Sequence, residues 1–99
     1  MKKIEKKILP EYYEDVVKRR KTFELRKDED DIQAGDTLVL KEWDGEKYTG
    51  NQVSRTVTYV LRNCTEYGLA DGYCIIAMQP FWWEEDARML HPSKDDDTI

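Results

Sequence analysis

At residues 21–26 the chain has the sequence Lys21-Thr22-Phe23-Glu24-Leu25-Arg26, in which charged and apolar side chains alternate. Alternation of this kind is typical of a β-strand, because residues two apart share one face. We predict that Phe23 and Leu25 form the apolar face that anchors this strand. Thr22, Glu24 and Arg26 then share the opposite face, which looks into a groove or into water.

The segments around this strand predict a mostly β (α+β) domain with one early helix. Strands of β-branched and alternating residues are expected at residues 3–9, 22–27, 37–43, 53–62 and 72–78. Pro10 suits the first turn of a helix, and residues 10–20 carry acidic side chains first and basic ones last, which complements the helix dipole. About five strands with a helix after the first predict a small, strongly twisted β-barrel, since closure protects sheet edges.

The chain has 99 residues, which predicts one domain over residues 1–80 with an aromatic and acidic tail at 81–99. No apolar run is long enough for a membrane span, and the first residues lack the apolar stretch of a signal peptide. Cys64 and Cys74 have neither metal-ligand spacing nor the pattern of a disulfide framework. We therefore expect a cytoplasmic protein with no metal and no cofactor.

The net charge of −5 is unevenly distributed along the chain. Residues 1–27 carry ten basic and five acidic side chains, whereas residues 28–50 carry two basic and eight acidic ones. Affinity for a polyanion depends on local charge. A small nucleic-acid contact at the basic end of the chain is therefore possible, and broad coating of DNA is excluded.

Lys21, Glu24 and Arg26 are the candidate site residues. Lysine and arginine can hold a phosphate or polarise a carbonyl, and glutamate can accept hydrogen bonds from a base amine or act as a general base. The same residues also fit a solvated strand with a surface salt bridge, which contributes little. Arg20 belongs to the basic run at 18–21, which fits RNA phosphates and, equally, the end of a helix dipole.

The aromatic residues supply candidate stacking surfaces. Trp43 and Tyr48 flank an Asp44-Gly45 turn, so we expect them to be exposed enough to stack on a nucleobase. The segment 81–83 (Phe-Trp-Trp) offers a contact for a second copy of the chain, and a protein–protein interaction module is the corresponding alternative function.

The motif at 21–26, followed by Gly35-Asp36 and an extended β segment, resembles the signature of the ASCH domain, a member of the PUA-like superfamily of small β-barrels. The wider pattern, with Glu42-Trp43-Asp44, Tyr48-Thr49-Gly50 and the strand at 57–61, looks like a bacterial and phage branch of unknown function. The resemblance covers residues 3–78.

The resemblance implies a cleft that binds RNA or a nucleotide-like ligand, such as a modified nucleobase. The candidate binding residues are then Arg20, Lys21, Thr22, Glu24, Arg26, Trp43 and Tyr48. It also implies a second possibility, because a related bacterial class hydrolyses the acetyl amide of N4-acetylcytidine with a lysine that corresponds to Lys21. A small amidohydrolase of this kind would use Lys21 and Glu24, and Glu24 stands where that class has its threonine nucleophile.

Overall fold

The computed structural model describes residues 1–81. Of the tail predicted at residues 81–99, residues 82–99, with Trp82, Trp83 and His91, lie outside the described residues. The described part contains five strands, one α-helix and one short 3₁₀ helix: β1 (Lys3–Ile8), α1 (Pro10–Val17), β2 (Phe23–Lys27), β3 (Thr37–Trp43), β4 (Tyr48–Leu61), η1 (Thr65–Tyr67) and β5 (Tyr73–Gln79). The prediction of a mostly β domain with one helix after the first strand is confirmed.

The helix is shorter and the fourth strand longer than the sequence predicts. Helix α1 ends at Val17 because Arg19 has a φ of 65°, which breaks the helical path. The carbonyl of Asp15 then accepts hydrogen bonds from the backbone amides of Arg20 and Lys21. Strand β4 begins at Tyr48, not at residue 53, because Tyr48 and Gln52 still pair with Trp43 and Lys41 of β3.

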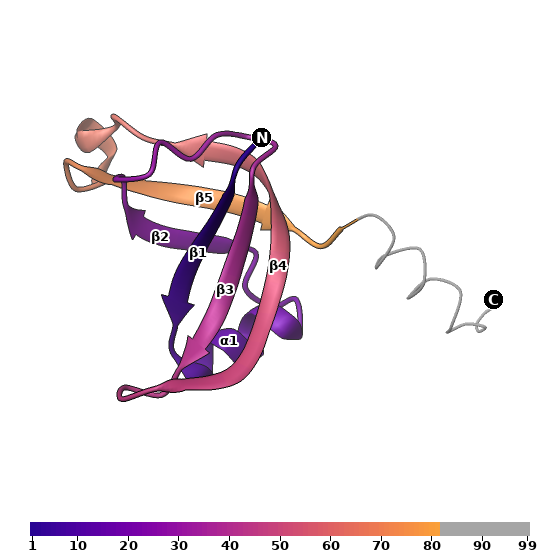
Figure 1. Ribbon diagram of the computed structural model, residues 1–99. Coiled ribbons are helices and arrows are strands. Elements are labelled where there is room, and N and C mark those ends of the chain that lie inside the picture. The colour runs from indigo at the N-terminus through magenta and orange to yellow at the C-terminus, as the bar shows by residue number, and fades with distance from the viewer. Residues whose placement is uncertain (82–99) are drawn as a thin grey trace.

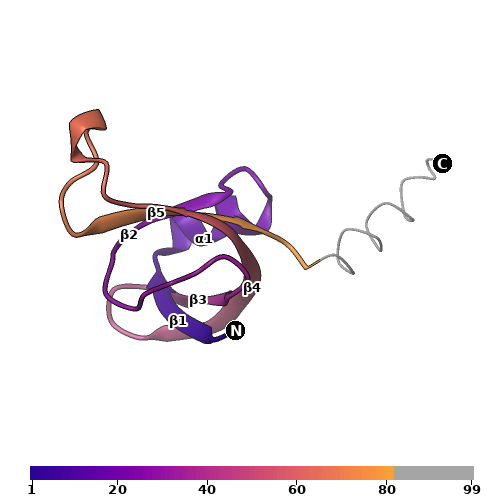
Figure 2. The same cartoon turned by 90° about the horizontal axis from the view of Figure 1, so that it is seen from above.

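The five strands form one mixed sheet in the order β1-β3-β4-β5-β2 (Figure 1). Strands β1 and β3 are parallel, and the other neighbours are antiparallel. Register shifts interrupt the ladders of β4 with β3 and with β5, and such irregularities increase strand twist. The sheet accordingly curls around the core, as the view in Figure 2 shows, and β1 and β2 are its two edges.

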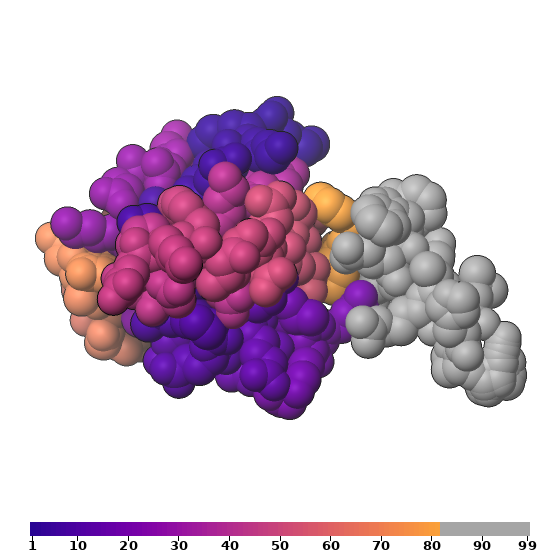
Figure 3. Space-filling model, turned by 60° about the horizontal axis from the view of Figure 1, so that its bottom comes forward, coloured from indigo at the N-terminus to yellow at the C-terminus, as the bar shows by residue number. Residues whose placement is uncertain are grey.

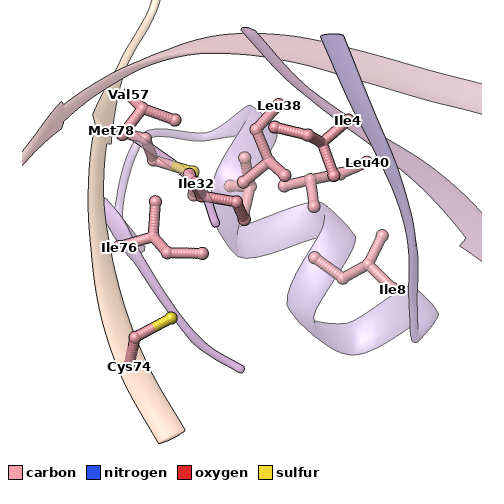
Figure 4. Close-up of a cluster of buried hydrophobic side chains, with 10 residues drawn as sticks. Ile4, Ile8, Ile32, Leu38, Leu40, Val57, Cys74, Ile76 and Met78 are labelled. Atoms are coloured by element: carbon pink, nitrogen blue, oxygen red, sulfur yellow. The ribbon is translucent and has the colours of Figure 1, made fainter. Parts of the chain in front are cut away.

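The hydrophobic core lies on the concave side of the sheet (Figure 4). Strands β1, β3 and β5 contribute residues from one face, as expected for a sheet with one buried side, β4 adds Val57, and β2 adds no apolar side chain. The buried apolar side chains are Ile4, Ile8, Val16, Ile32, Leu38, Leu40, Val57, Cys74, Ile76 and Met78. Helix α1 closes this core with Val16, and the segment between β2 and β3 adds Ile32.

The prediction that Phe23 and Leu25 form the buried face of β2 is wrong. Phe23 and Leu25 are 48% and 58% exposed, whereas Glu24 is 2% exposed. Glu24 pairs in register with the core residue Ile76, so the carboxylate lies on the concave side of the sheet. This orientation is stable because two cationic side chains neutralise the carboxylate, and alternation alone does not show which of two faces points inward.

Two carboxylates hold the segment between β2 and β3. Asp28 forms a two-pronged salt bridge with Arg62, at 2.6 and 3.0 Å. Asp36 is buried and accepts hydrogen bonds from the backbone amides of Lys2 (3.0 Å) and Gln33 (2.8 Å). These amides, with the Lys2 ammonium, lower the pKa of Asp36 from 3.8 to about 2.

Within residues 1–81, no helix is both long enough and apolar enough to cross a membrane. Figure 3 shows the face on which the β3–β4 hairpin (magenta to pink) lies above the helical segment (violet).

Candidate functional site: a cleft between the two edge strands

A cleft of about 360 Å³ lies where the end of β1, the start of α1 and strand β2 meet. One wall is β2 together with Lys21, and the other is formed by residues 7–9 and Tyr12. The two walls come from opposite edges of the sheet, which its curl brings near each other (Figure 2). The cleft therefore depends on the global fold and not on one loop.

Glu24 is the central polar group of this cleft. Its Oε1 accepts a hydrogen bond from Nε of Arg26 at 2.8 Å and forms an ion pair with Nη2 at 2.7 Å, and its Oε2 contacts Nζ of Lys21. The side chain of Glu24 is 3% exposed, against 18% for Lys21 and 24% for Arg26. The carboxylate is thus buried between two cations that still reach solvent. One negative charge lies beside two positive ones.

The same two cations also contact other parts of the cleft. Arg26 Nη2 donates a hydrogen bond to the carbonyl oxygen of Lys7 at 2.7 Å. The ammonium of Lys21 lies 5.5 Å from the ring centre of Tyr12 and 5.3 Å from that of Phe23. Two partly exposed aromatic rings therefore flank the charged group, which gives the cleft both apolar and ionic surfaces.

This arrangement suits a small, flat, polar ligand. A buried carboxylate accepts hydrogen bonds from N–H donors, whereas the ammonium and guanidinium donate to carbonyl or phosphate oxygens. Aromatic rings at the cleft rim offer faces for stacking. Among residues 1–81, no three or more His, Cys, Asp or Glu side chains are grouped so as to hold a metal ion.

The structure brings together three of the seven predicted site residues, Lys21, Glu24 and Arg26. Arg20 does not line the cleft, because its guanidinium pairs with Asp15 at 2.7 Å on the surface. Thr22 is exposed and lies outside the lining, and its carbonyl accepts the Met78 amide of β5.

Trp43 and Tyr48 also lie outside the lining of this cleft. They face each other across the β3–β4 turn with ring centres 5.0 Å apart and planes at 74°. Tyr48 is 51% exposed, as expected for a residue beside a turn. The two rings form a separate group on the hairpin.

Sequence reasoning missed the opposite wall, which consists of residues 7–9 and Tyr12. Tyr12 is not among the predicted site residues, but its side chain is 44% exposed while Val16 on the same helix is buried. Pro10 was the available signal, because a proline at the first helical position fixes where α1 starts and hence where Tyr12 lies relative to the end of β1.

Comparison with known proteins places the chain in a family without a known function. Residues 4–78 match the model of the family described as domain of unknown function DUF3850. This match covers more than half of the chain, so the chain belongs to that family. A search of the curated proteins found no match.

Proposed function

We propose that the cleft binds a nucleobase, either within RNA or in a nucleotide-like ligand. The observation that carries this proposal is Glu24, a carboxylate that is 2% exposed and held between Lys21 and Arg26 in a cleft of about 360 Å³. That volume falls in the range of about 300–1,000 Å³ that is usual for small-molecule pockets.

In this proposal each group of the cleft recognises one part of the base. The Glu24 carboxylate accepts the exocyclic amine or ring N–H at the base edge, and Lys21 or Arg26 donates to a base carbonyl or a phosphate. The exposed rings of Tyr12 and Phe23 offer stacking faces. Because Glu24 is already paired with Lys21 and Arg26, an uncharged ligand can enter without leaving the buried carboxylate unpaired.

We further propose that the curled sheet is a β-barrel of the PUA-like type, as the ASCH resemblance implies. Five strands and a helix after the first strand agree with such a barrel. The edges β1 and β2 would then be connected through Arg26 and the carbonyl of Lys7, in place of a continuous backbone ladder.

The decisive experiment is a titration of the protein with a panel of nucleosides and nucleoside monophosphates, followed by NMR and calorimetry. We expect shifts at the cleft residues and an affinity loss of about tenfold or more in Glu24→Gln, since a charged acceptor is worth more than a neutral one. Glu66→Gln is the matched control, because Glu66 is exposed on η1. Absence of binding by the parent protein, or equal affinities for Glu24→Gln and parent, would overturn the proposal.

A second candidate function is hydrolysis of an acylated nucleoside, and the contact of Lys21 Nζ with Glu24 Oε2 favours it. In this reaction Glu24 accepts a proton from water, the water oxygen attacks the acyl carbon, and Lys21 donates to the carbonyl oxygen. The C–N amide bond then breaks, and the leaving amine takes up the proton. Incubation with N4-acetylcytidine and chromatography for cytidine tests it, and equal turnover by Lys21→Ala and parent would contradict it.

A further inference from the structure

A second hollow of about 180 Å³ lies on the β3–β4 hairpin, outside the cleft described above. Its lining consists of Lys41 from β3 together with Tyr48, Gly50, Asn51 and Gln52 from β4. It is thus composed of one cation, one aromatic ring, two amides and a glycine. The hairpin that carries it forms the centre of the face in Figure 3.

Two lysines are positioned by aromatic rings next to this hollow. Lys7 Nζ lies 3.8 Å from the ring centre of Trp43 and 5.8 Å from that of Tyr48. Lys41 Nζ lies 5.7 Å from the ring centre of Tyr48. Contacts of this kind hold an ammonium without neutralising its charge, so the cations remain available to an anion.

Lys7 connects the hollow with the cleft. Its main-chain carbonyl accepts the Arg26 hydrogen bond and the residue lines the cleft, whereas its ammonium lies over the hairpin rings. Lys7 also pairs in register with Lys41, and residues in register on neighbouring parallel strands lie side by side. Within residues 1–81, no carboxylate forms an ion pair with Lys7, whereas Lys41 pairs with Glu5 at 3.1 Å on the surface.

Because Lys7 connects the cleft with the hollow, we infer that the hollow is a second nucleotide subsite and that the ligand of the protein is a single-stranded oligonucleotide. The inference rests on the proposed function of the cleft. One base occupies the cleft, the adjoining phosphate meets Lys7 and Lys41, and the next base stacks on Tyr48. The phosphate displaces Glu5 from Lys41, which costs little because exposed ion pairs are weak.

The acidic net charge of the chain makes this local arrangement necessary. A protein of charge −5 repels a polyanion over long distances, so binding has to come from a few directed contacts. Neutralisation of this one phosphate predicts a slope of about −0.7 in a plot of log affinity against log salt concentration for a single strand. Binding of a nucleoside alone lacks this dependence.

The test compares short single-stranded RNA and DNA of one mixed sequence with the ribonucleoside monophosphates, using fluorescence anisotropy and calorimetry. We expect Tyr48→Ala to lower oligonucleotide affinity on the order of 10- to 100-fold, as loss of a base–aromatic stack does. Its affinity for the monophosphates should stay within about twofold of the parent, since Tyr48 lies outside the cleft.

Further variants separate the contributions. Tyr48→Phe keeps the ring and should retain oligonucleotide binding, which also guards against a folding defect in Tyr48→Ala. Lys41→Ala should lower oligonucleotide affinity and make the salt slope shallower than that of the parent, because Lys7 is then the only lysine of the pair that meets the phosphate. Tyr67→Ala is the matched control, because Tyr67 is 86% exposed on η1 and is remote from both sites in the sequence. Comparison of the RNA and DNA series shows which backbone is preferred.

The outcomes distinguish the two proposals. An oligonucleotide affinity no higher than that of a monophosphate, or equal losses for both ligands in Tyr48→Ala, would overturn the second subsite and leave the cleft in place. If Tyr48→Ala weakens oligonucleotide binding while Glu24→Gln does not, the nucleobase cleft fails and the hairpin subsite stands. A parent protein that binds no member of either series would overturn both.

Discussion

Arg26 Nη2 on strand β2 donates a 2.7 Å hydrogen bond to the carbonyl oxygen of Lys7 on strand β1. These strands are the two edges of the sheet, the first and the last of its five strands in spatial order. The same guanidinium holds the buried carboxylate of Glu24. One side chain thus joins the sheet edges and positions the main polar group of the cleft, which makes structure and candidate site interdependent.

Replacement of Arg26 should therefore reduce both stability and ligand binding. Arg26→Ala leaves the Glu24 carboxylate buried with Lys21 as its remaining partner and leaves the Lys7 carbonyl without its donor. We expect the free energy of unfolding to fall by about 2–4 kcal/mol, slightly less than the roughly 3–5 kcal/mol for a fully buried ion pair because the Arg26 side chain is 24% exposed. Urea unfolding monitored by circular dichroism measures this change.

Arg20→Ala serves as the control for this substitution. Arg20 also pairs with a carboxylate, Asp15, but its side chain is 59% exposed and that of Asp15 is 39% exposed. We expect a loss of no more than about 1 kcal/mol, as is usual for surface ion pairs. Equal losses in the two variants would mean that Arg26 does not bridge the edges.

The buried carboxylate of Asp36 should make stability depend on pH in the acid range. Its pKa in the folded protein, about 2, is below the ordinary value of 3.8. The unfolded chain consequently binds a proton first as pH falls. The stabilisation by Asp36 is complete above about pH 4 and is lost as pH falls toward 2, and it amounts to about 2 kcal/mol.

The measurement is the free energy of unfolding from pH 2 to pH 7 for the parent and for Asp36→Asn. The parent should lose about 2 kcal/mol more than the variant across this window, because asparagine does not titrate. Asp28, whose pKa is lowered by hydrogen bonds from Arg62, contributes to both curves and cancels in the difference. Parallel curves for the two proteins would contradict the assignment.

The bridge of Asp28 with Arg62 should control the order of the segment between β2 and β3. Arg62 contacts both carboxylate oxygens of Asp28 and donates to the carbonyl of Ile32 at 3.0 Å. Lysine cannot reproduce this forked geometry. In Arg62→Lys we expect faster amide hydrogen exchange in residues 28–36 and a stability loss of about 1–2 kcal/mol. Unchanged exchange there, with Arg20→Lys as control, would refute this role.

Local sequence patterns predicted where the strands and the helix lie better than they predicted which of these elements contact one another. Alternation and β-branched residues located strand β3 at its observed bounds, and Pro10 located the start of α1. The spacing of Glu24 and Arg26 predicted their association, since residues two apart on a strand share a face. Lys21 lies three residues before Glu24, and strand spacing did not predict its contact with that carboxylate. The opposite wall was missed because it depends on the crossover from β1 to β3, a non-local pairing that no short pattern encodes.

The orientation of β2 was missed for a different physical reason. The hydrophobic effect favours Phe23 and Leu25 inward, but on the concave side Glu24 finds two cations and Arg26 finds the Lys7 carbonyl. A satisfied ionic group therefore occupies a position that apolar patterning assigns to the outside. Such a departure from pattern is expected at functional sites, where chemistry and not packing selects the residue.

This inverted orientation gives a prediction about two neighbouring apolar residues. Leu25 is 58% exposed on the outer face of β2, whereas Ile76 of β5 is fully buried beside Glu24. Leu25→Thr keeps a residue that suits a strand and should change the free energy of unfolding by about 0.5 kcal/mol or less. Ile76→Ala removes buried methyl and methylene groups and should cost about 2–5 kcal/mol.

Urea unfolding of both variants beside the parent decides between the two orientations of β2. If Leu25 pointed into the core, as its alternation with Glu24 and Arg26 suggests in the sequence, Leu25→Thr would cost several kcal/mol through a cavity and a buried hydroxyl. A cost for Leu25→Thr that approaches that of Ile76→Ala would therefore contradict the inward position of Glu24. It would also remove the buried carboxylate on which the proposed cleft depends.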